Sequence, residues 1–66
     1  MYKNLIGEIA VRKIAKTEIA SKMGIDRSTL ENKLTGKSKF TISEMFFLKT
    51  MFFPDAKPEE LFEKIS

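Results

Sequence analysis

The stretch from residue 16 to residue 36, KTEIASKMGIDRSTLENKLTG, constrains the fold more than any other part of the chain. Ile19, Ala20 and Met23 recur at the spacing of one face of a helix. Gly24 follows directly, and a glycine just past the last periodic residue can take the left-handed conformation that closes a helix. The pattern therefore predicts a short helix over about residues 16–23 that ends in a tight turn.

A second short helix is predicted over about residues 27–35. Asp26 is a good N-cap, because its carboxylate can accept from the free backbone N–H groups of the next turn. Leu30 and Leu34 are four residues apart and face inward, and Gly36 gives another C-cap signal. The residues left on the outer face are polar or charged: Arg27, Ser28, Glu31, Asn32 and Thr35.

This spacing resembles the helix-turn-helix of phage repressor and Cro proteins. Ala20 matches the small residue where the two helices of that motif cross, and Gly24 matches the glycine of its turn. Ile25 matches the apolar residue after the turn, while Leu30 and Leu34 match the inward face of the recognition helix. The resemblance implies binding to duplex DNA, with the second helix as the recognition helix.

The resemblance extends over nearly the whole chain. LTGKSKFTISE is similar to the end of the recognition helix and the next loop in repressors of Gram-positive phages, and MFFPDAKPEELF is similar to their last loop and closing helix. It implies an all-α, five-helix, lambda-repressor-like domain over residues 1–66. It also implies a phage or prophage transcriptional regulator of the XRE type that binds a two-fold operator as a homodimer. The length favours a Cro-like protein, although a fragment of a longer repressor has the same pattern.

Composition limits the chemistry of the chain. It has no cysteine and no histidine, which excludes a disulfide and a thiolate metal site and removes the commonest metal ligand. Nucleophilic catalysis by Ser/His or Cys/His is excluded for the same reason. We therefore expect no enzyme, no metal and no cofactor. The sequence shows neither an apolar run long enough for a bilayer nor a signal-peptide core, so we expect a cytoplasmic protein.

Charge is distributed unevenly along the chain. Residues 1–39 hold nine Lys/Arg against four Asp/Glu, and residues 40–66 hold three against five. The first part, with a net charge of +5, contains the helix-turn-helix, while the second has a net charge of −2. A solvated basic face is one reading of this asymmetry. Its coincidence with the motif favours nucleic acid.

Three further helices complete the pattern. The first is predicted over about residues 2–13, where Gly7 is either simply tolerated or permits a close approach to another helix. The last begins at Pro58, which suits the first helical position, and its apolar side carries Leu61, Phe62 and Ile65. No alternating apolar pattern with turn dipeptides indicates a strand. The chain is therefore predicted to be all-α.

The fourth helix has the clearest start signal. Thr41 and Glu44 have the spacing of a capping box, and Phe40 and Met45 have that of a hydrophobic staple. Pro54 ends the helix, which is predicted from residue 42 to 52 or 53. Across the five helices, ten apolar residues are predicted to be mostly buried: Ile9, Ile19, Ala20, Met23, Ile25, Leu30, Leu34, Met45, Leu48 and Phe52.

Three side chains of the recognition helix are predicted to contact bases. Arg27 can make two hydrogen bonds to guanine, Ser28 can donate or accept, and Asn32 can read adenine. Glu31 has two interpretations. It accepts from cytosine N4, or it pairs with Arg27 four residues before it, and we slightly favour the pairing.

Phosphate contacts are predicted from a cluster around the motif: Lys16, Thr17, Lys33, Lys37 and Lys39. Such contacts position a protein on DNA but carry no direct sequence information. The alternative for each lysine is a solvated surface position.

The fourth helix has more apolar residues than one buried stripe needs. Ile42, Met45, Leu48 and Phe52 are predicted to form the buried face. Phe46, Phe47 and Met51 are predicted to form a dimer interface, with Phe47 furthest from the core. Coverage of the surplus by the fifth helix is the alternative. The surplus also supports a second function, that of a helical protein-interaction module, antitoxin-like or anti-repressor, with weak DNA affinity.

Overall fold

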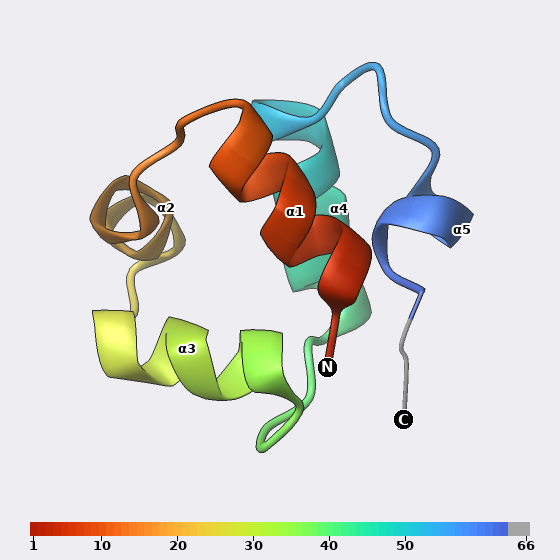
Figure 1. Cartoon of the computed structure of the whole chain (residues 1–66). Helices are drawn as coiled ribbons and strands as arrows, with labels where there is room; N and C mark the ends of the chain where they lie inside the picture. Colours follow the sequence, from red (N-terminus) through yellow and green to blue (C-terminus); the bar gives the residue numbers. More distant parts are fainter. Residues whose placement is uncertain (64–66) are drawn as a thin grey trace.

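The computed structural model describes residues 1–63, which form five α-helices (Figure 1). The helices in chain order are α1 (Lys3–Val11), α2 (Lys16–Met23), α3 (Arg27–Thr35), α4 (Ile42–Phe52) and α5 (Pro58–Leu61). The described residues contain no strand, so the all-α prediction is confirmed. Among them, no helix has the length and apolar character needed to cross a membrane.

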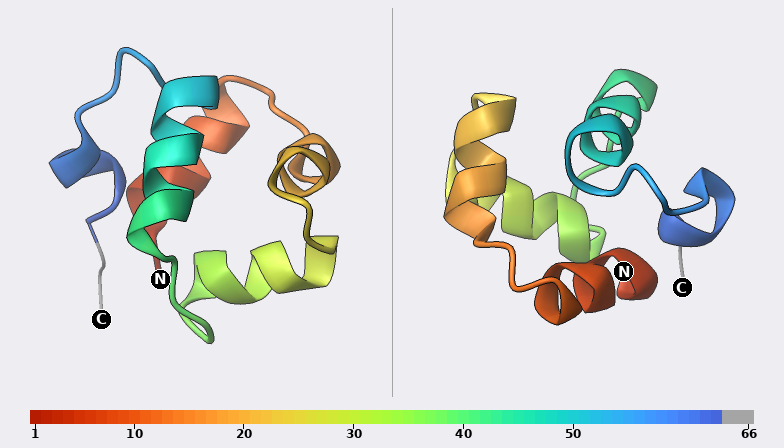
Figure 2. Two further views of the ribbon diagram at one scale, coloured as in Figure 1. Left: turned by 180° about the vertical axis from the view of Figure 1, so that it is seen from behind. Right: turned by 90° about the horizontal axis from the view of Figure 1, so that it is seen from above.

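The arrangement places α2 and α5 at opposite ends of the molecule, as Figure 1 and the view from above in Figure 2 both show. α2 packs against α3 and α4, and α1 packs against α3 and α5. In Figure 1 α2 is seen nearly end-on while α3 lies across the view, so the two helices run in very different directions. The predicted pair of helices with a turn at Gly24 is confirmed.

The core takes side chains from all five helices and from the segments between them. Of the ten residues predicted to be mostly buried, six are buried: Ile9, Ile19, Ala20, Leu30, Leu34 and Leu48. The other four, Met23, Ile25, Met45 and Phe52, are half-buried and pack against this core. Tyr2 and Phe53 are also buried. Both lie just outside a helix, where helical periodicity gives no signal.

Three rings join the two ends of the described chain. Tyr2 lies edge-on to Phe40 and Phe62, with ring centroids 5.2 and 6.5 Å away. Phe40 and Phe62 are 6.1 Å apart in a similar edge-on arrangement. The backbone N–H of Tyr2 donates to the carbonyl of Leu34 at 3.0 Å, which ties the N-terminus to the end of α3.

Three helices end in the same left-handed turn. Gly24 and Gly36 have φ values of 72° and 92°, as expected from their sequence positions. Lys13 takes a φ of 55° after α1, and its N–H donates to the carbonyl of Ala10. α1 therefore ends at Val11 and not near Lys13. The sequence concealed this end because no glycine marks it.

The start of α4 follows the prediction closely. Thr41 accepts from the N–H of Glu44 at 3.1 Å, and the carboxylate of Glu44 accepts from the N–H of Thr41 at 2.8 Å. Phe40 is buried and Met45 is half-buried. By contrast, Asp26 occupies the N-cap position of α3 but its side chain makes no capping hydrogen bond, so the expected carboxylate cap is wrong.

The rotation of α4 differs from the prediction. Ile42 was expected in the buried face but is 76% exposed. Leu48, Met45 and Phe52 lie on the inward side, and Ile42 lies roughly 90° from their middle around the helix. Because α4 is apolar nearly all round, periodicity does not define which side faces the core.

Two smaller points are also resolved. A Cβ added to Gly7 would meet no atom within 4 Å, so this glycine is tolerated and permits no close approach. Leu61, the last residue of α5, is buried, and Phe62 directly after it is half-buried. Ile65, the third residue predicted for the apolar side, lies outside the described residues.

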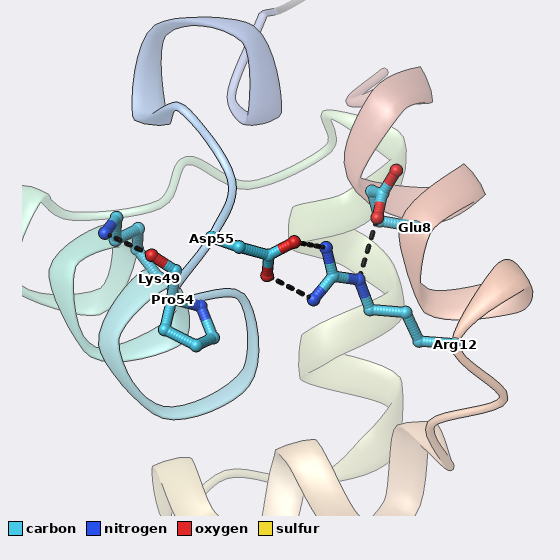
Figure 3. Close-up of polar contacts among 5 residues, drawn as sticks. All are labelled: Glu8, Arg12, Lys49, Pro54 and Asp55. Carbon is cyan, nitrogen blue, oxygen red and sulfur yellow. Dashed lines mark hydrogen bonds and ion pairs between the residues drawn. The ribbon is translucent and has the colours of Figure 1, made fainter.

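A guanidinium ties α1 to the segment before α5 (Figure 3). Arg12 donates through Nη1 and Nη2 to the two carboxylate oxygens of Asp55 at 2.8 and 3.0 Å, and through Nε to Glu8 at 2.8 Å. It also lies over the ring of Phe53, 5.2 Å from its centroid. The hydrogen bonds from Arg12 lower the pKa of Asp55. Nearby, Lys49 donates to the carbonyl of Pro54 at 2.9 Å.

Candidate nucleic-acid interface

α3 is held as a platform by its inner face. Leu30 and Leu34 are fully covered, and Ala20 of α2 is also buried. These buried contacts fix the rotation of α3 and place a row of polar and charged side chains on its outside. The exposed members of the row are Arg27, Ser28, Asn32 and Thr35.

Glu31 is only half-exposed, and its partner differs from the one expected. Its Oε1 lies 2.8 Å from Nζ of Lys16, the first residue of α2. The pairing with Arg27 that we favoured is therefore wrong. The nearby ammonium of Lys16 lowers the pKa of Glu31, and the positive charge of Arg27 adds to this only at longer range. Sequence spacing missed the pair because it joins two helices rather than two turns of one helix.

Lys33 points into the structure. Its ammonium donates to the backbone carbonyl of Lys39 at 3.0 Å and to Glu44 at 3.1 Å, and it lies 5.9 Å from the centroid of the Phe40 ring. Its side chain is 13% exposed. These contacts bridge the end of α3 and the start of α4, and they leave little of Lys33 for a phosphate.

Glu44 stays ionised within this bridge. Burial raises the pKa of its carboxyl group, but the hydrogen bonds from the Thr41 N–H and from Lys33 outweigh burial and lower it. One carboxylate thus caps α4 and anchors Lys33 of α3. The loop between these two helices is fixed at both of its ends.

The loop between α3 and α4 carries the two lysines of the predicted phosphate cluster that are exposed, Lys37 and Lys39. The N–H groups of Lys37 and Ser38 both donate to the carbonyl of Asn32, at 2.9 and 3.1 Å. Within residues 1–63 no ion pair involves Arg27, Lys37 or Lys39. These three cations and the exposed Thr17 are thus the parts of the predicted surface whose side chains are available to an anion.

A separate apolar groove lies between α4 and α5. It has a volume of about 490 Å³, and its lining includes Ile42, Met45, Phe46 and Phe62. Phe46 is 70% exposed and Met51 is 54% exposed, whereas Phe47 is half-buried. The expectation that Phe47 points furthest from the core is therefore wrong.

Ile42 and the α5 side of the groove were missed at the sequence level. A helical wheel of α4 places Ile42 and Phe46 together on the outside only when it is centred on Leu48, and the sequence does not single out Leu48.

Comparison of the chain with protein-family models, with curated proteins and with solved structures finds no match. The geometry described above is therefore the basis for a functional interpretation.

Proposed function

We propose that this protein binds duplex DNA in a sequence-specific manner as a small transcriptional regulator in the cytoplasm, of the phage repressor or Cro type. The observation that carries the proposal is the outer face of α3, where Arg27, Ser28 and Asn32 are exposed on a helix whose inner face is buried. A helix presented in this way fits the major groove, and these side chains can hydrogen-bond base edges.

The electrostatics of this face support the proposal. Exposed positive charges lie in the α3 row at Arg27 and beside it at Lys37 and Lys39. The acid in that row, Glu31, is neutralised by Lys16. Lys37, Lys39 and Thr17 are the proposed phosphate contacts. The engagement of Lys33 with Glu44 makes it the weakest member of the phosphate cluster. The affinity should fall steeply with salt, by about 0.9 in the log–log slope per neutralised phosphate.

A second copy of the chain is the proposed partner, seated on the groove between α4 and α5. The groove has one charge of each sign, Lys49 and Glu59, so a two-fold axis can set each opposite its complement. The Cα atoms span 25 × 24 × 22 Å. A dimer of molecules this size offers one α3 to each of two half-sites one DNA turn, about 34 Å, apart.

Selection of bound sequences from a random duplex library tests the DNA proposal directly. The wild type should enrich a defined site, and Arg27→Ala should weaken binding to it by about 1–3 kcal/mol and relax the preference at one base pair. Lys37→Ala should weaken binding to all sequences alike. Lys57→Ala is the control, because Lys57 lies at the start of α5 and belongs to neither the α3 row nor the loop after it. Enrichment of no sequence would defeat the proposal.

Sedimentation at high micromolar concentration tests the dimer. Phe46→Lys should weaken self-association and cooperative binding to a symmetric site without loss of helical content. Val11→Lys is the matched control, since Val11 is equally exposed but lies on α1, outside the groove. A wild type that stays monomeric both free and on a symmetric site would contradict the dimer.

The exposed Ile42 and Phe46 also favour a second candidate function. A helical interaction module would bind another protein through this groove and have little affinity for DNA. Salt-dependent binding to a duplex with a single half-site, weakened in Arg27→Ala but kept in Phe46→Lys, separates the two, because only the DNA function depends on the face of α3.

A further inference from the structure

The ion pair between Lys16 and Glu31 crosses the two helices of the helix-turn-helix. Nζ of Lys16 lies 2.8 Å from Oε1 of Glu31, with 32% and 38% of the two side chains exposed. Oε1 is shielded from solvent and accepts no aligned hydrogen bond within residues 1–63, so its close contact is the ion pair with Lys16. The pair therefore holds one carboxylate oxygen in a defined place between α2 and α3.

The other oxygen of Glu31 is left for a different partner. Oε2 accepts no hydrogen bond from residues 1–63, and it is not among their shielded polar atoms. Ser28 and Asn32, both exposed, lie three positions before and one position after Glu31 on α3. The acceptor thus lies one helical turn from Ser28, at the edge of the outer row that Asn32 continues.

Neutralisation by Lys16 changes what Glu31 can do near DNA. An isolated acid on this face would repel the phosphates, but the pair has no net charge. An ionised carboxylate only accepts, so it discriminates between base edges by their donors. In the major groove cytosine presents the N4 amino group as a donor, whereas guanine N7 and O6 and thymine O4 are acceptors. Adenine sets its acceptor N7 beside its N6 donor, so cytosine is the best match.

We propose that Glu31 is a specificity-determining residue that selects a C·G base pair, and that Lys16 is the positioning residue that holds it, not a phosphate contact. The inference rests on the proposed DNA-binding function and assigns the two residues roles within it. It predicts that a change at either residue affects the preference for the same base pair.

The test compares binding to the selected operator with binding to operators substituted at each position. Glu31→Gln should reduce the preference for cytosine at one position by about 5- to 150-fold, the range expected for one good base contact. Lys16→Met should reduce the preference at that same position. The double variant should lose no more than the larger single effect, since the two residues act as a unit. Lys16→Arg should keep the preference for cytosine, because arginine can still form the ion pair with Glu31.

Lys37→Met is the matched control, because Lys37 is exposed in the loop after α3 and makes no ion pair within residues 1–63. It should weaken binding to every sequence and leave the preferences unchanged. If Lys16→Met behaves like Lys37→Met, with a salt slope lower by about 1 and no altered preference, Lys16 is a phosphate contact and the inference is overturned. That result leaves the DNA-binding proposal intact, whereas a wild type that selects no sequence defeats both.

A measurement without DNA tests the pair itself. The pKa of the Glu31 carboxyl, followed by NMR, should rise in Lys16→Met and stay low in Lys16→Arg, because Lys16 lowers it in the wild type. An unchanged Glu31 pKa in Lys16→Met would show that Lys16 does not hold the carboxylate in solution. The inference would then fail whatever the DNA results.

Discussion

The α2–α3 half and the α4–α5 half of this protein differ in how strongly their sequences determine side-chain orientation. In α3 the two leucines are the only large apolar residues, both are buried, and four of the five residues of the polar row are exposed as predicted. In α4 most positions are apolar, and Ile42 and Phe46 are exposed while Leu48 is buried. A sparse apolar pattern therefore determines the rotation of a helix, and an abundant one leaves it open.

The largest effect should come from Leu48→Ala. Leu48 is fully covered, so truncation should lower the free energy of unfolding by about 2–5 kcal/mol. Phe46→Ala, on the same helix, removes more atoms but should change it by no more than about 0.5 kcal/mol in the monomer. Urea unfolding at low concentration measures both. Equal losses would mean that α4 is rotated differently from the structure.

The two N-caps should differ by a smaller amount. Thr41 makes both hydrogen bonds of the capping box, so Thr41→Ala should cost about 1 kcal/mol of unfolding free energy. Asp26 occupies the same position before α3 without a capping bond, and Asp26→Ala should cost less. Thermal unfolding compares the pair. A larger loss for Asp26→Ala would indicate a cap in solution that the structure lacks.

The sequence was sufficient to predict the helices, but it was insufficient to predict which side chains of different helices contact each other. The five helices, the turn at Gly24 and the capping box of Thr41 and Glu44 all depend on neighbours within four residues, so local patterns predict them. The Lys16–Glu31 and Arg12–Asp55 pairs join residues 15 and 43 positions apart, and no local pattern encodes them. The groove was missed for the same reason, because it depends on where α5 lies beside α4.

Two glycine substitutions should have effects of opposite sign. Gly7 is helical with open space around it, so Gly7→Ala should stabilise the fold by about 0.5–1 kcal/mol. Gly24 has equally open surroundings but a φ of 72°, so Gly24→Ala should destabilise it by about 1 kcal/mol. Thermal unfolding of both variants makes the comparison. A stabilising Gly24→Ala would contradict the left-handed turn between α2 and α3.

The smallest effect should be the pH dependence of the stability that the Lys33–Glu44 ion pair contributes between α3 and α4. The pKa of Glu44 lies below its ordinary value of 4.5, so its contribution is present above pH 4.5 and is lost as the pH falls through the lower folded value. Glu31 and Asp55 shift in the same direction. The unfolding free energy of the wild type should therefore decline below pH 4.5. Glu44→Gln should show a shallower decline, and an identical decline would exclude a role for Glu44.

The link from Tyr2 to the end of α3 has a consequence for how the molecule opens. Its N–H donates to the carbonyl of Leu34, and its ring contacts Phe40 and Phe62, so the first and last described segments share one cluster with the end of α3. Chain ends that dock in this way do not fray independently. The Tyr2 amide should exchange its hydrogen with solvent as slowly as the amides of α3, only when the whole domain unfolds.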